Sequence, residues 1–174
     1  MRGVLWCNGS IPTKSVVEWV LSTEAPVFGV DGGADKARGL GIEVIEVLGD
    51  MDSVDESSWK GRTLPLCEQS FSDLAKSIEQ LIDRGYEEIE IVGADGGDPS
   101  HILGNWGSMN DAPSGARIRI HHEEQVSTRI HPDDGEFSAE FEEGERFSIF
   151  AIGTGKVWIS GARWEVDGEN LVLS

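Results

Sequence analysis

The sequence is short of basic residues. Only 14 lysines and arginines stand against 32 aspartates and glutamates, which gives a formal net charge of −18. A nucleic-acid partner requires a basic surface to neutralise its phosphates, so this composition argues against one. The excess of acid is compatible with a salt-rich cytoplasm, where a carboxylate surface keeps a protein dissolved, and equally with a protein that is simply acidic.

Long apolar runs and cysteines are also scarce. No stretch approaches the about 20 apolar residues of a membrane span, and the N-terminal MRGVLWCNGS lacks the apolar segment of a signal peptide. The two cysteines, Cys7 and Cys67, have neither a metal-binding spacing nor a disulfide framework. We therefore expect a cytoplasmic protein without a membrane partner. Its 174 residues, 39% of them hydrophobic, suffice for one domain or two small ones.

The first two-thirds of the sequence alternate between strand and helix signals. Short apolar runs predict strands at residues 4–7, 27–30, 44–48 and 88–93, and helical spacing predicts helices at 15–21 and 35–40. The clearest helix lies in SDLAKSIEQLIDRG, where apolar residues recur on one face, a serine can cap the start and Gly85 follows the end. This alternation predicts a Rossmann-like α/β domain over residues 1–112, with a mostly parallel sheet and helices on its faces.

The pattern changes after the segment APSG at residues 112–115. The runs RIRIHHEE, VSTRI, FSAEFEE, RFSIFAIG, KVWIS and ENLVL alternate between apolar and polar residues, and helical spacing is absent. We therefore predict a small β-sandwich over residues 116–174. His121, His122 and His131 fall in these alternating runs and point to different faces, so we do not expect them to bind a metal. Trp158 and Trp164 are expected to lie in the core or on a dimer surface.

Polar turns follow the predicted parallel strands. They are Asn8-Gly9, Asp31-Gly32-Gly33, Gly49-Asp50 and the segment GADGG at 93–97. Open α/β sheets bind ligands beyond the carboxyl ends of their strands, and glycines there let backbone N–H groups approach phosphates. Ordinary strand-to-helix turns also favour glycine and aspartate, so each turn alone is weak evidence. Together they predict a site for a phosphate with a divalent metal.

Asp73 and Lys76 lie three residues apart and share one face of the clearest helix. This spacing fits a surface ion pair of little energetic consequence. It also fits a carboxylate ligand of Mg²⁺ beside a lysine that holds a phosphate oxygen, since Asp73 is expected near the edge of the sheet where the polar turns meet.

Three segments together resemble the thiamin pyrophosphokinase family: VDGGADKARGLGIEVIEVLGDMDS, QSFSDLAKSIEQL and GADGGDPSHILGN. Their order and spacing match the family over residues 4–110, and RFSIFAIG, KVWISGARWEV and ENLVLS resemble the family's β-sandwich. The resemblance implies transfer of the pyrophosphoryl group from ATP to the hydroxyl of thiamin, with release of AMP. It also implies a homodimer to which the β unit contributes.

The resemblance assigns roles to particular residues. Asp31, Asp50, Asp52 and Asp73 would hold Mg²⁺ and the ATP phosphates, and Asp73 and Lys76 would be catalytic, with Lys76 on a phosphate. The predicted nucleotide-binding residues are Asn8, Gly9, Asp31, Gly32, Gly33, Lys76, His101 and Asn105.

The sequence departs from the family at GGDPSH, where the family has GGRxDH. Asp98 replaces the arginine and Ser100 replaces the aspartate, and an anion in place of a cation is expected to weaken ATP binding. The family also continues, beyond the position of Ser174, with a Ser-Asn segment that helps form the thiamin pocket across the dimer. Two alternatives therefore stay open: the same chemistry on another acceptor such as a hydroxymethylpterin, or a nucleotide- or metabolite-binding protein without catalysis.

Overall fold

The computed structural model of the protein describes residues 1–172. The chain divides into two compact units, with the boundary between residues 136 and 137. The elements of the first unit are β1 (Arg2–Trp6), α1 (Lys14–Val20), β2 (Val27–Val30), α2 (Gly33–Gly39), β3 (Glu46–Gly49), the 3-10 turn η1 (Glu56–Ser58), β4 (Thr63–Pro65), α3 (Asp73–Asp83), β5 (Glu88–Val92), α4 (Pro99–Asp111), β6 (Arg117–His121), β7 (Val126–Thr128) and η2 (Pro132–Asp134). The second unit contains β8 (Thr154–Ile159) and β9 (Val166–Val172).

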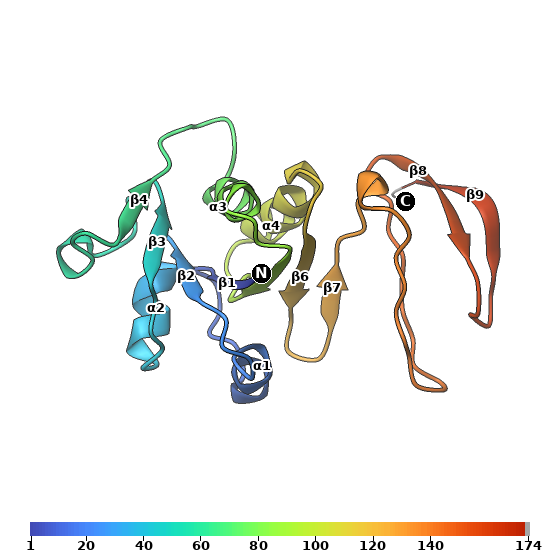
Figure 1. The fold of residues 1–174 in the computed structure, drawn as a ribbon, viewed down its shortest axis with the longest axis horizontal. Helices are drawn as coiled ribbons and strands as arrows, with labels where there is room; N and C mark the ends of the chain where they lie inside the picture. The colour runs from blue at the N-terminus through green and yellow to red at the C-terminus, as the bar shows by residue number, and fades with distance from the viewer. Residues whose placement is uncertain (173–174) are drawn as a thin grey trace. The chain divides into compact units, whose positions relative to one another are not determined.

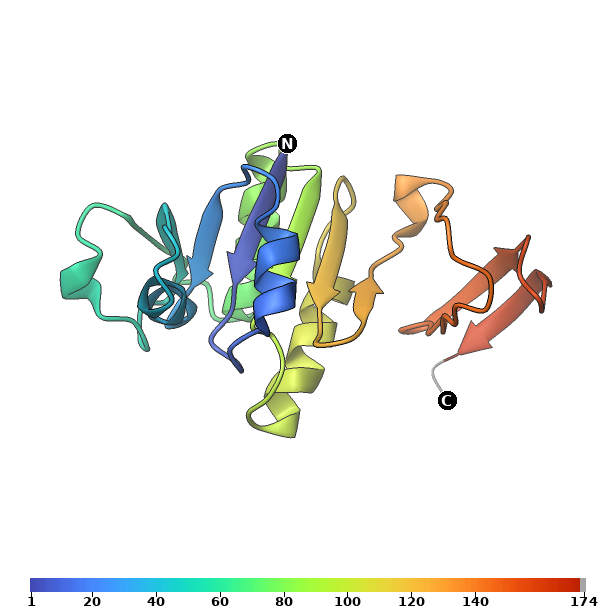
Figure 2. The same ribbon diagram turned by 90° about the horizontal axis from the view of Figure 1, so that it is seen from below.

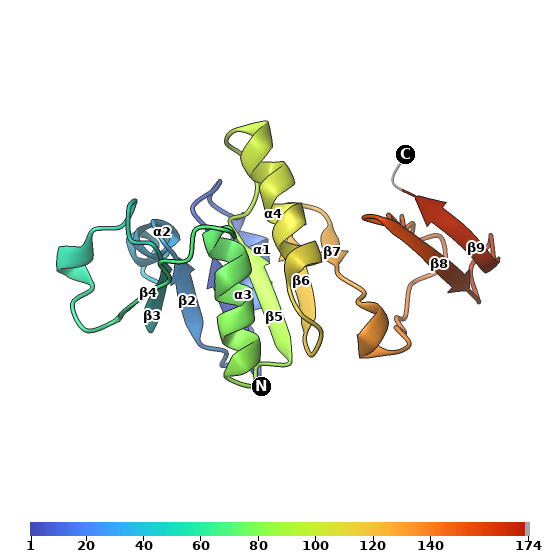
Figure 3. The same ribbon diagram turned by 90° about the horizontal axis from the view of Figure 1, so that it is seen from above.

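The first unit is built on a seven-stranded sheet with the order β4-β3-β2-β1-β5-β6-β7. Every neighbouring pair is parallel except β6 and β7, which are antiparallel. Figure 2 shows α1 on one face of the sheet, and Figure 3 shows α3 and α4 on the other. The chain first adds strands on one side of β1 and then places β5 on its other side (Figure 1). The predicted mostly parallel α/β architecture is therefore confirmed.

Apolar side chains fill both faces of the central strands. Leu5 and Val4 are fully buried on β1, Leu5 in the cluster under α3 and α4 and Val4 in the cluster under α1 and α2. Burial on both faces explains why the central strands are continuous apolar runs. The predicted stripe on α3 faces the core, and Ser72 caps this helix by accepting a hydrogen bond from the backbone N–H of Ala75 at 3.1 Å.

The structure divides the chain later than the predicted boundary at 112–116. Strand β6 pairs with β5 in parallel, so RIRIH completes the first sheet and the first unit extends to residue 136. Within the described residues, the second unit has one sheet, the antiparallel pair β8 and β9. FSAEFEE and RFSIFAIG, which were predicted as strands, lie in residues 137–153, where the structure has no strand. Helix α4 was not predicted.

No helix in the described part of the chain combines the length and the apolar character needed to cross a bilayer.

A buried carboxylate lies in the middle of this sheet. Glu90 on β5 is fully buried and accepts hydrogen bonds from Arg2 Nε at 3.1 Å and Arg119 Nε at 3.0 Å, while its Oε2 lies 2.6 Å from His121 Nε2. Burial alone would raise the pKa of Glu90, but the hydrogen bonds and charges of His121 and Arg119 outweigh it and lower the pKa from an ordinary 4.5 to about 2. The ionised form of Glu90 is therefore the one that stabilises the fold.

We expect Glu90→Gln to lower the free energy of unfolding by about 3 kcal/mol at pH 7 and by about 1 kcal/mol at pH 3. The stabilisation from ionised Glu90 is complete above the unfolded pKa near 4.5 and is lost as the pH falls toward the folded pKa near 2. Urea unfolding at both pH values measures the difference. The exposed Glu43→Gln is the control and should change little at either pH, whereas an equal cost of Glu90→Gln at pH 7 and pH 3 would contradict the assigned charge state.

Candidate functional site

Three carboxylates meet at the carboxyl edge of the parallel sheet. Asp31 follows β2, Asp50 follows β3, and Asp73 begins α3. One oxygen from each lies within 4.8 Å of the others. Strands β2 and β3 are neighbours, and α3 packs across β1, β2 and β3, which brings residues far apart in the sequence to one place. The structure thus brings together three of the four predicted metal ligands, which we call the aspartate trio.

Asp31 is the buried member of the trio, with 7% of its surface exposed. Its backbone has a φ of +48°, an unfavourable conformation for a residue with a side chain. Oδ2 accepts a hydrogen bond from Ser53 Oγ at 2.5 Å, whereas Oδ1 is buried without a hydrogen-bond partner among residues 1–172. Burial raises the pKa of Asp31, and the carboxylates of Asp52 and Asp73 raise it further against the opposing effect of Ser53.

Asp52, the fourth predicted ligand, lies outside the trio. Its backbone N–H donates to Oδ1 of Asp50 at 3.2 Å, and Met51 between them has a φ of +69°. This tight turn directs Asp50 into the trio and leaves the side chain of Asp52 exposed, although Asp52 is close enough to raise the pKa of Asp31. Of the two aspartates in the stretch GDMDS, Asp50 therefore belongs to the trio and Asp52 does not.

Lys76 is buried beside the trio, with an exposed fraction of 8%. Its ammonium lies 2.8 Å from Oδ1 of Asp73 and donates to the backbone carbonyls of Leu66 at 2.7 Å and Glu68 at 2.9 Å. The two carbonyls accept hydrogen bonds from the ammonium, whereas the contact with Asp73 is an ion pair that leaves Oδ1 of Asp73 without a hydrogen bond among the described residues. Lys76 therefore lies against Asp73 and holds the segment before α3 in place through the two carbonyls.

Ser53 connects the turns that follow β1, β2 and β3. Besides donating to Asp31, its hydroxyl oxygen accepts from the backbone N–H of Gly32 at 3.1 Å and from Asn8 Nδ2 at 3.4 Å. Ser53 belongs to the motif GDMDS, but no role is predicted for it from the sequence. Serine is common in turns, so its presence in the sequence does not indicate a role. Its hydrogen bonds in the structure identify it as the link between three turns.

Lys36, also missed from the sequence, fixes the turn after β1. Its ammonium on α2 donates to the carbonyls of Asn8 and Gly9, both at 2.6 Å. Gly9 in turn donates its N–H to the carbonyl of Gly93 at 2.7 Å, and a Cβ on Gly9 would overlap that carbonyl and the one of Asp95. The glycine at position 9 is therefore required by the close contact between the β1 and β5 turns.

The remaining predicted nucleotide-binding residues serve the fold in different ways. A Cβ on Gly33 would overlap the carbonyl of Trp6, so this glycine lets α2 start against β1. Asn105 on α4 donates from Nδ2 to the carbonyl of Ala94 at 2.7 Å and so holds the turn after β5. His101 is exposed on the first turns of α4.

Asp98 caps the N-terminus of α4. Its Oδ1 accepts hydrogen bonds from the backbone N–H and from the hydroxyl of Ser100, both at 2.8 Å, and Pro99 occupies the first helical position. These hydrogen bonds from Ser100 lower the pKa of Asp98. The two departures from the family pattern, Asp98 and Ser100, are thus partners in one helix cap.

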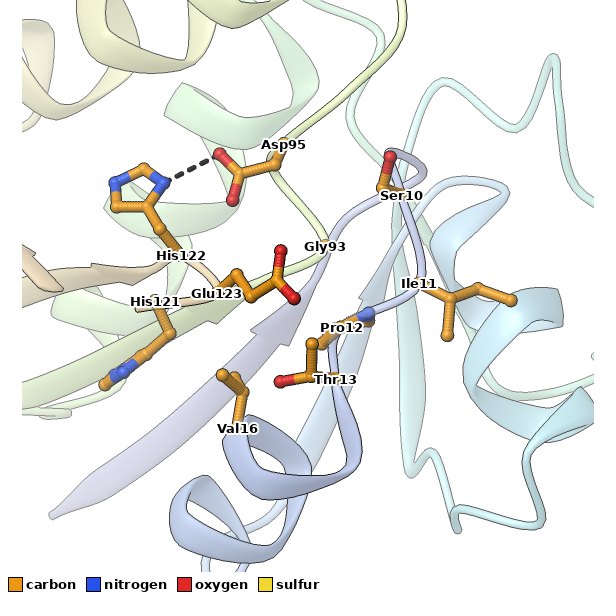
Figure 4. Close-up of a pocket in the computed structure, with 10 residues that line it drawn as sticks. All are labelled: Ser10, Ile11, Pro12, Thr13, Val16, Gly93, Asp95, His121, His122 and Glu123. Atoms are coloured by element: carbon orange, nitrogen blue, oxygen red, sulfur yellow. Dashed lines mark hydrogen bonds and ion pairs between the residues drawn. The ribbon is translucent and has the colours of Figure 1, made fainter. Parts of the chain in front are cut away.

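A pocket of about 200 Å³ lies on the other side of the β1 turn. Figure 4 shows its walls: residues 10–13 and Val16 on one side, and the β5 turn and residues 121–123 on the other. At its rim, His122 Nδ1 lies 2.7 Å from Oδ1 of Asp95 and its Nε2 lies 2.9 Å from Ser127 Oγ. His121, the last residue of β6, contacts Glu90, whereas the next residue, His122, contacts Asp95, and neither histidine belongs to the trio.

The chemistry of the trio fits a hard divalent cation such as Mg²⁺. Mg²⁺ prefers oxygen ligands and is usually held by a few carboxylates that share it with water and substrate phosphates. The trio supplies three carboxylates, and the buried Oδ1 of Asp31 accepts no hydrogen bond from any residue that the structure describes. Asp31, Asp50 and Asp73 are the residues that would hold the ion.

Comparisons with solved structures identify the fold. A thiamine pyrophosphokinase from Bacillus subtilis aligns with 99% of this chain and 85% of its own, with a TM-score of 0.72 at 19% identity. A probable thiamine pyrophosphokinase from Staphylococcus saprophyticus is 25% identical over 70% of this chain and 65% of its own, with a TM-score of 0.53. A thiamin pyrophosphokinase from Geobacillus thermodenitrificans is 19% identical over 70% of this chain and 59% of its own, with a TM-score of 0.55.

The matched regions thus span less than two thirds of the Staphylococcus and Geobacillus proteins. A comparison with curated proteins found no match. The family model for the catalytic domain of thiamin pyrophosphokinase matches residues 18–120, more than half of the chain, and this range contains all three members of the aspartate trio. The chain therefore belongs to the thiamin pyrophosphokinase family.

Proposed function

We propose that this protein is a Mg²⁺-dependent pyrophosphokinase that transfers the β,γ-pyrophosphoryl group of ATP to the hydroxyl of thiamin. The acceptor oxygen forms a bond to the β-phosphorus, the bond from that phosphorus to the α,β-bridging oxygen breaks, AMP leaves with this oxygen, and the hydroxyl proton goes to solvent. The observation that supports the proposal is the aspartate trio in a chain of this family. Bound Mg²⁺ would neutralise and polarise the phosphate oxygens.

The residues of the chain contribute by positioning. Lys76 orients Asp73 through its ion pair, and Ser53 orients Asp31 through its hydrogen bond. The substrate phosphates would enter beside Asn8, Gly9, Gly32 and Gly33, where the turns lie close together. Because such a site works by placing charges in advance, small displacements of the trio are expected to be costly.

A second candidate is nucleotide binding without transfer. It is supported by Lys76, whose ammonium is paired with Asp73 and donates to two backbone carbonyls of the chain, and by Asp98, which stands where the family has a cation. In this case, ATP would bind through the metal, but no residue of the chain would stabilise the charge that develops during transfer.

Measurement of AMP released from Mg-ATP separates these candidates. With thiamin as acceptor, we expect release that is absent without acceptor and weaker with a hydroxymethylpterin. Asp50→Asn should reduce release by about a thousandfold, because one ligand of the metal is removed. Asp83→Asn, at the end of α3 and away from the trio, is the matched control. ATP binding without AMP release for any acceptor would favour the second candidate, and release that is unchanged in Asp50→Asn would refute the metal site.

The charge of Asp98 and its role as the N-cap of α4 can be tested separately. Asp98→Asn keeps a capping side chain and removes the charge, so we expect unchanged stability and a less than threefold change in the Kd of Mg-ATP, because the carboxylate is exposed and directed at Ser100. Asp98→Ala should lower the free energy of unfolding by about 1 kcal/mol. Thermal unfolding and calorimetry measure the two effects. A gain of tenfold or more in ATP affinity in Asp98→Asn would show that the carboxylate faces the phosphates.

We also propose that the protein is a cytoplasmic homodimer to which the second unit contributes. This unit exposes several large apolar side chains, among them Phe150, Trp158 and Trp164, which are 66%, 65% and 75% exposed. Apolar surface of this kind usually marks an interaction site. Light scattering at micromolar concentration should give twice the monomer mass, and Trp158→Ser with Trp164→Ser should shift it toward the monomer. A monomer in the unmodified protein would contradict the proposal.

A further inference from the structure

The pocket in Figure 4 lies beyond the carboxyl end of β1, where the order of the strands in the sheet reverses. Strands β2, β3 and β4 follow on one side of β1, whereas β5 and β6 follow on the other. Loops on the two sides separate at such a point and leave a crevice beyond the carboxyl ends of the strands, where nucleotides commonly bind. Residues 10–13 after β1, the turn at Gly93 and Asp95 after β5, and Glu123 after β6 line this crevice.

The size of the pocket fits one part of a nucleotide. Pockets for drug-sized ligands measure about 300–1,000 Å³, and this one measures about 200 Å³. It therefore accommodates a nucleoside or a single ring system, and the remainder of a larger ligand must lie outside it. One wall, formed by Ile11, Pro12 and Val16, is largely apolar, as the flat face of a base requires.

Two carboxylates provide unused hydrogen-bond acceptors in this pocket. Glu123 points across it toward the segment after β1 (Figure 4) and has no hydrogen bond or ion pair within the described part of the chain. Asp95 uses Oδ1 for His122, and its Oδ2 has no partner among the same residues. Two acceptors in one small pocket match a vicinal diol, which offers two O–H donors.

His122 fixes the position of Asp95. Its ring lies between Asp95 and Ser127 at 2.7 and 2.9 Å and stacks on Trp106, with 6.0 Å between the ring centroids and 14° between the planes. A neutral ring that donates from Nδ1 to Asp95 can accept from the Ser127 hydroxyl at Nε2, so both nitrogens are satisfied. Asp95 is therefore held in one orientation before any ligand binds.

The pocket and the aspartate trio are separated by the β1 turn. Asp31 follows β2 and Asp95 follows β5, which are the two neighbours of β1, so they are two strand spacings apart, or about 10 Å. A triphosphate attached to a ribose in the pocket would reach the trio over this distance. Asn8, Gly9 and Ser10 form the connection between the two places.

We propose that this pocket binds the nucleoside of the donor and that Asp95 and Glu123 determine specificity by accepting hydrogen bonds from the 2′- and 3′-hydroxyls of its ribose. The inference rests on the proposed function, since it requires a nucleotide with its phosphates at the trio. Two carboxylates would also attract a cationic heterocycle such as the acceptor, and the experiment includes this outcome.

The test compares the Kd values of Mg-ATP, Mg-2′-deoxy-ATP, Mg-3′-deoxy-ATP and Mg-tripolyphosphate, measured by calorimetry without acceptor. The full chain should bind ATP about ten- to a hundredfold more tightly than either deoxy nucleotide, because each hydroxyl donates to a charged acceptor. Glu123→Ala should lower the affinity for ATP to that for one deoxy nucleotide and leave tripolyphosphate binding unchanged. Glu124→Ala makes the same charge change one residue outside the pocket and should leave all four affinities unchanged.

The contrary outcomes distinguish the two proposals. Equal affinities for ATP and both deoxy nucleotides, with tripolyphosphate binding that depends on Asp50, would overturn the ribose assignment and leave the metal site standing. Thiamin binding that Glu123→Ala weakens, with ATP affinity unchanged, would assign the pocket to the acceptor and overturn the inference. No binding of ATP or of tripolyphosphate would overturn the proposed function together with the inference.

Discussion

Repulsion among the carboxylates at the edge of the sheet is the constraint around which the site is built. Two unit charges about 4 Å apart repel by about 4 kcal/mol at an effective dielectric near 20. The oxygens of the aspartate trio lie within 4.8 Å of one another, and one of the three residues is buried. The strained backbone of Asp31, the hydroxyl of Ser53 and the ammonium of Lys76 hold the charges together. A divalent cation would offset the repulsion that these contacts leave.

The parts of the fold that were predictable are those with a local signal in the sequence. Strands β1, β2, β3 and β5 are apolar runs that end in polar turns, and both signals are local. The assignment of β6 to a second unit failed because the alternation in RIRIH is the same whether the strand joins a parallel sheet or a separate antiparallel one. Helix α4 was missed because PSHILGNWGSMND has two glycines and few apolar residues, so its helical character depends on the Asp98 cap and on packing.

The candidate site was predictable where a residue type alone indicates a role. Asp31, Asp50 and Asp73 follow strands or begin a helix, so the topology brings them together, whereas the place of Asp52 depends on a tight turn at Met51 that the sequence does not specify. Ser53 could not be assigned, because its role depends on contacts with residues 21 and 45 positions away. Long-range contacts of this kind have no local signature.

The scarcity of basic residues also has a consequence at the site. Lys36 and Lys76 are the lysines that contact its turns and the trio, and both donate to backbone carbonyls. Withdrawing either ammonium to bind a phosphate would leave those carbonyls without a partner, at a cost of about 1–3 kcal/mol for each buried group. In a chain of net charge −18, the neutralisation of a bound triphosphate would therefore fall mainly to a metal ion. The proposed reaction should accordingly depend more steeply on Mg²⁺ than on either lysine.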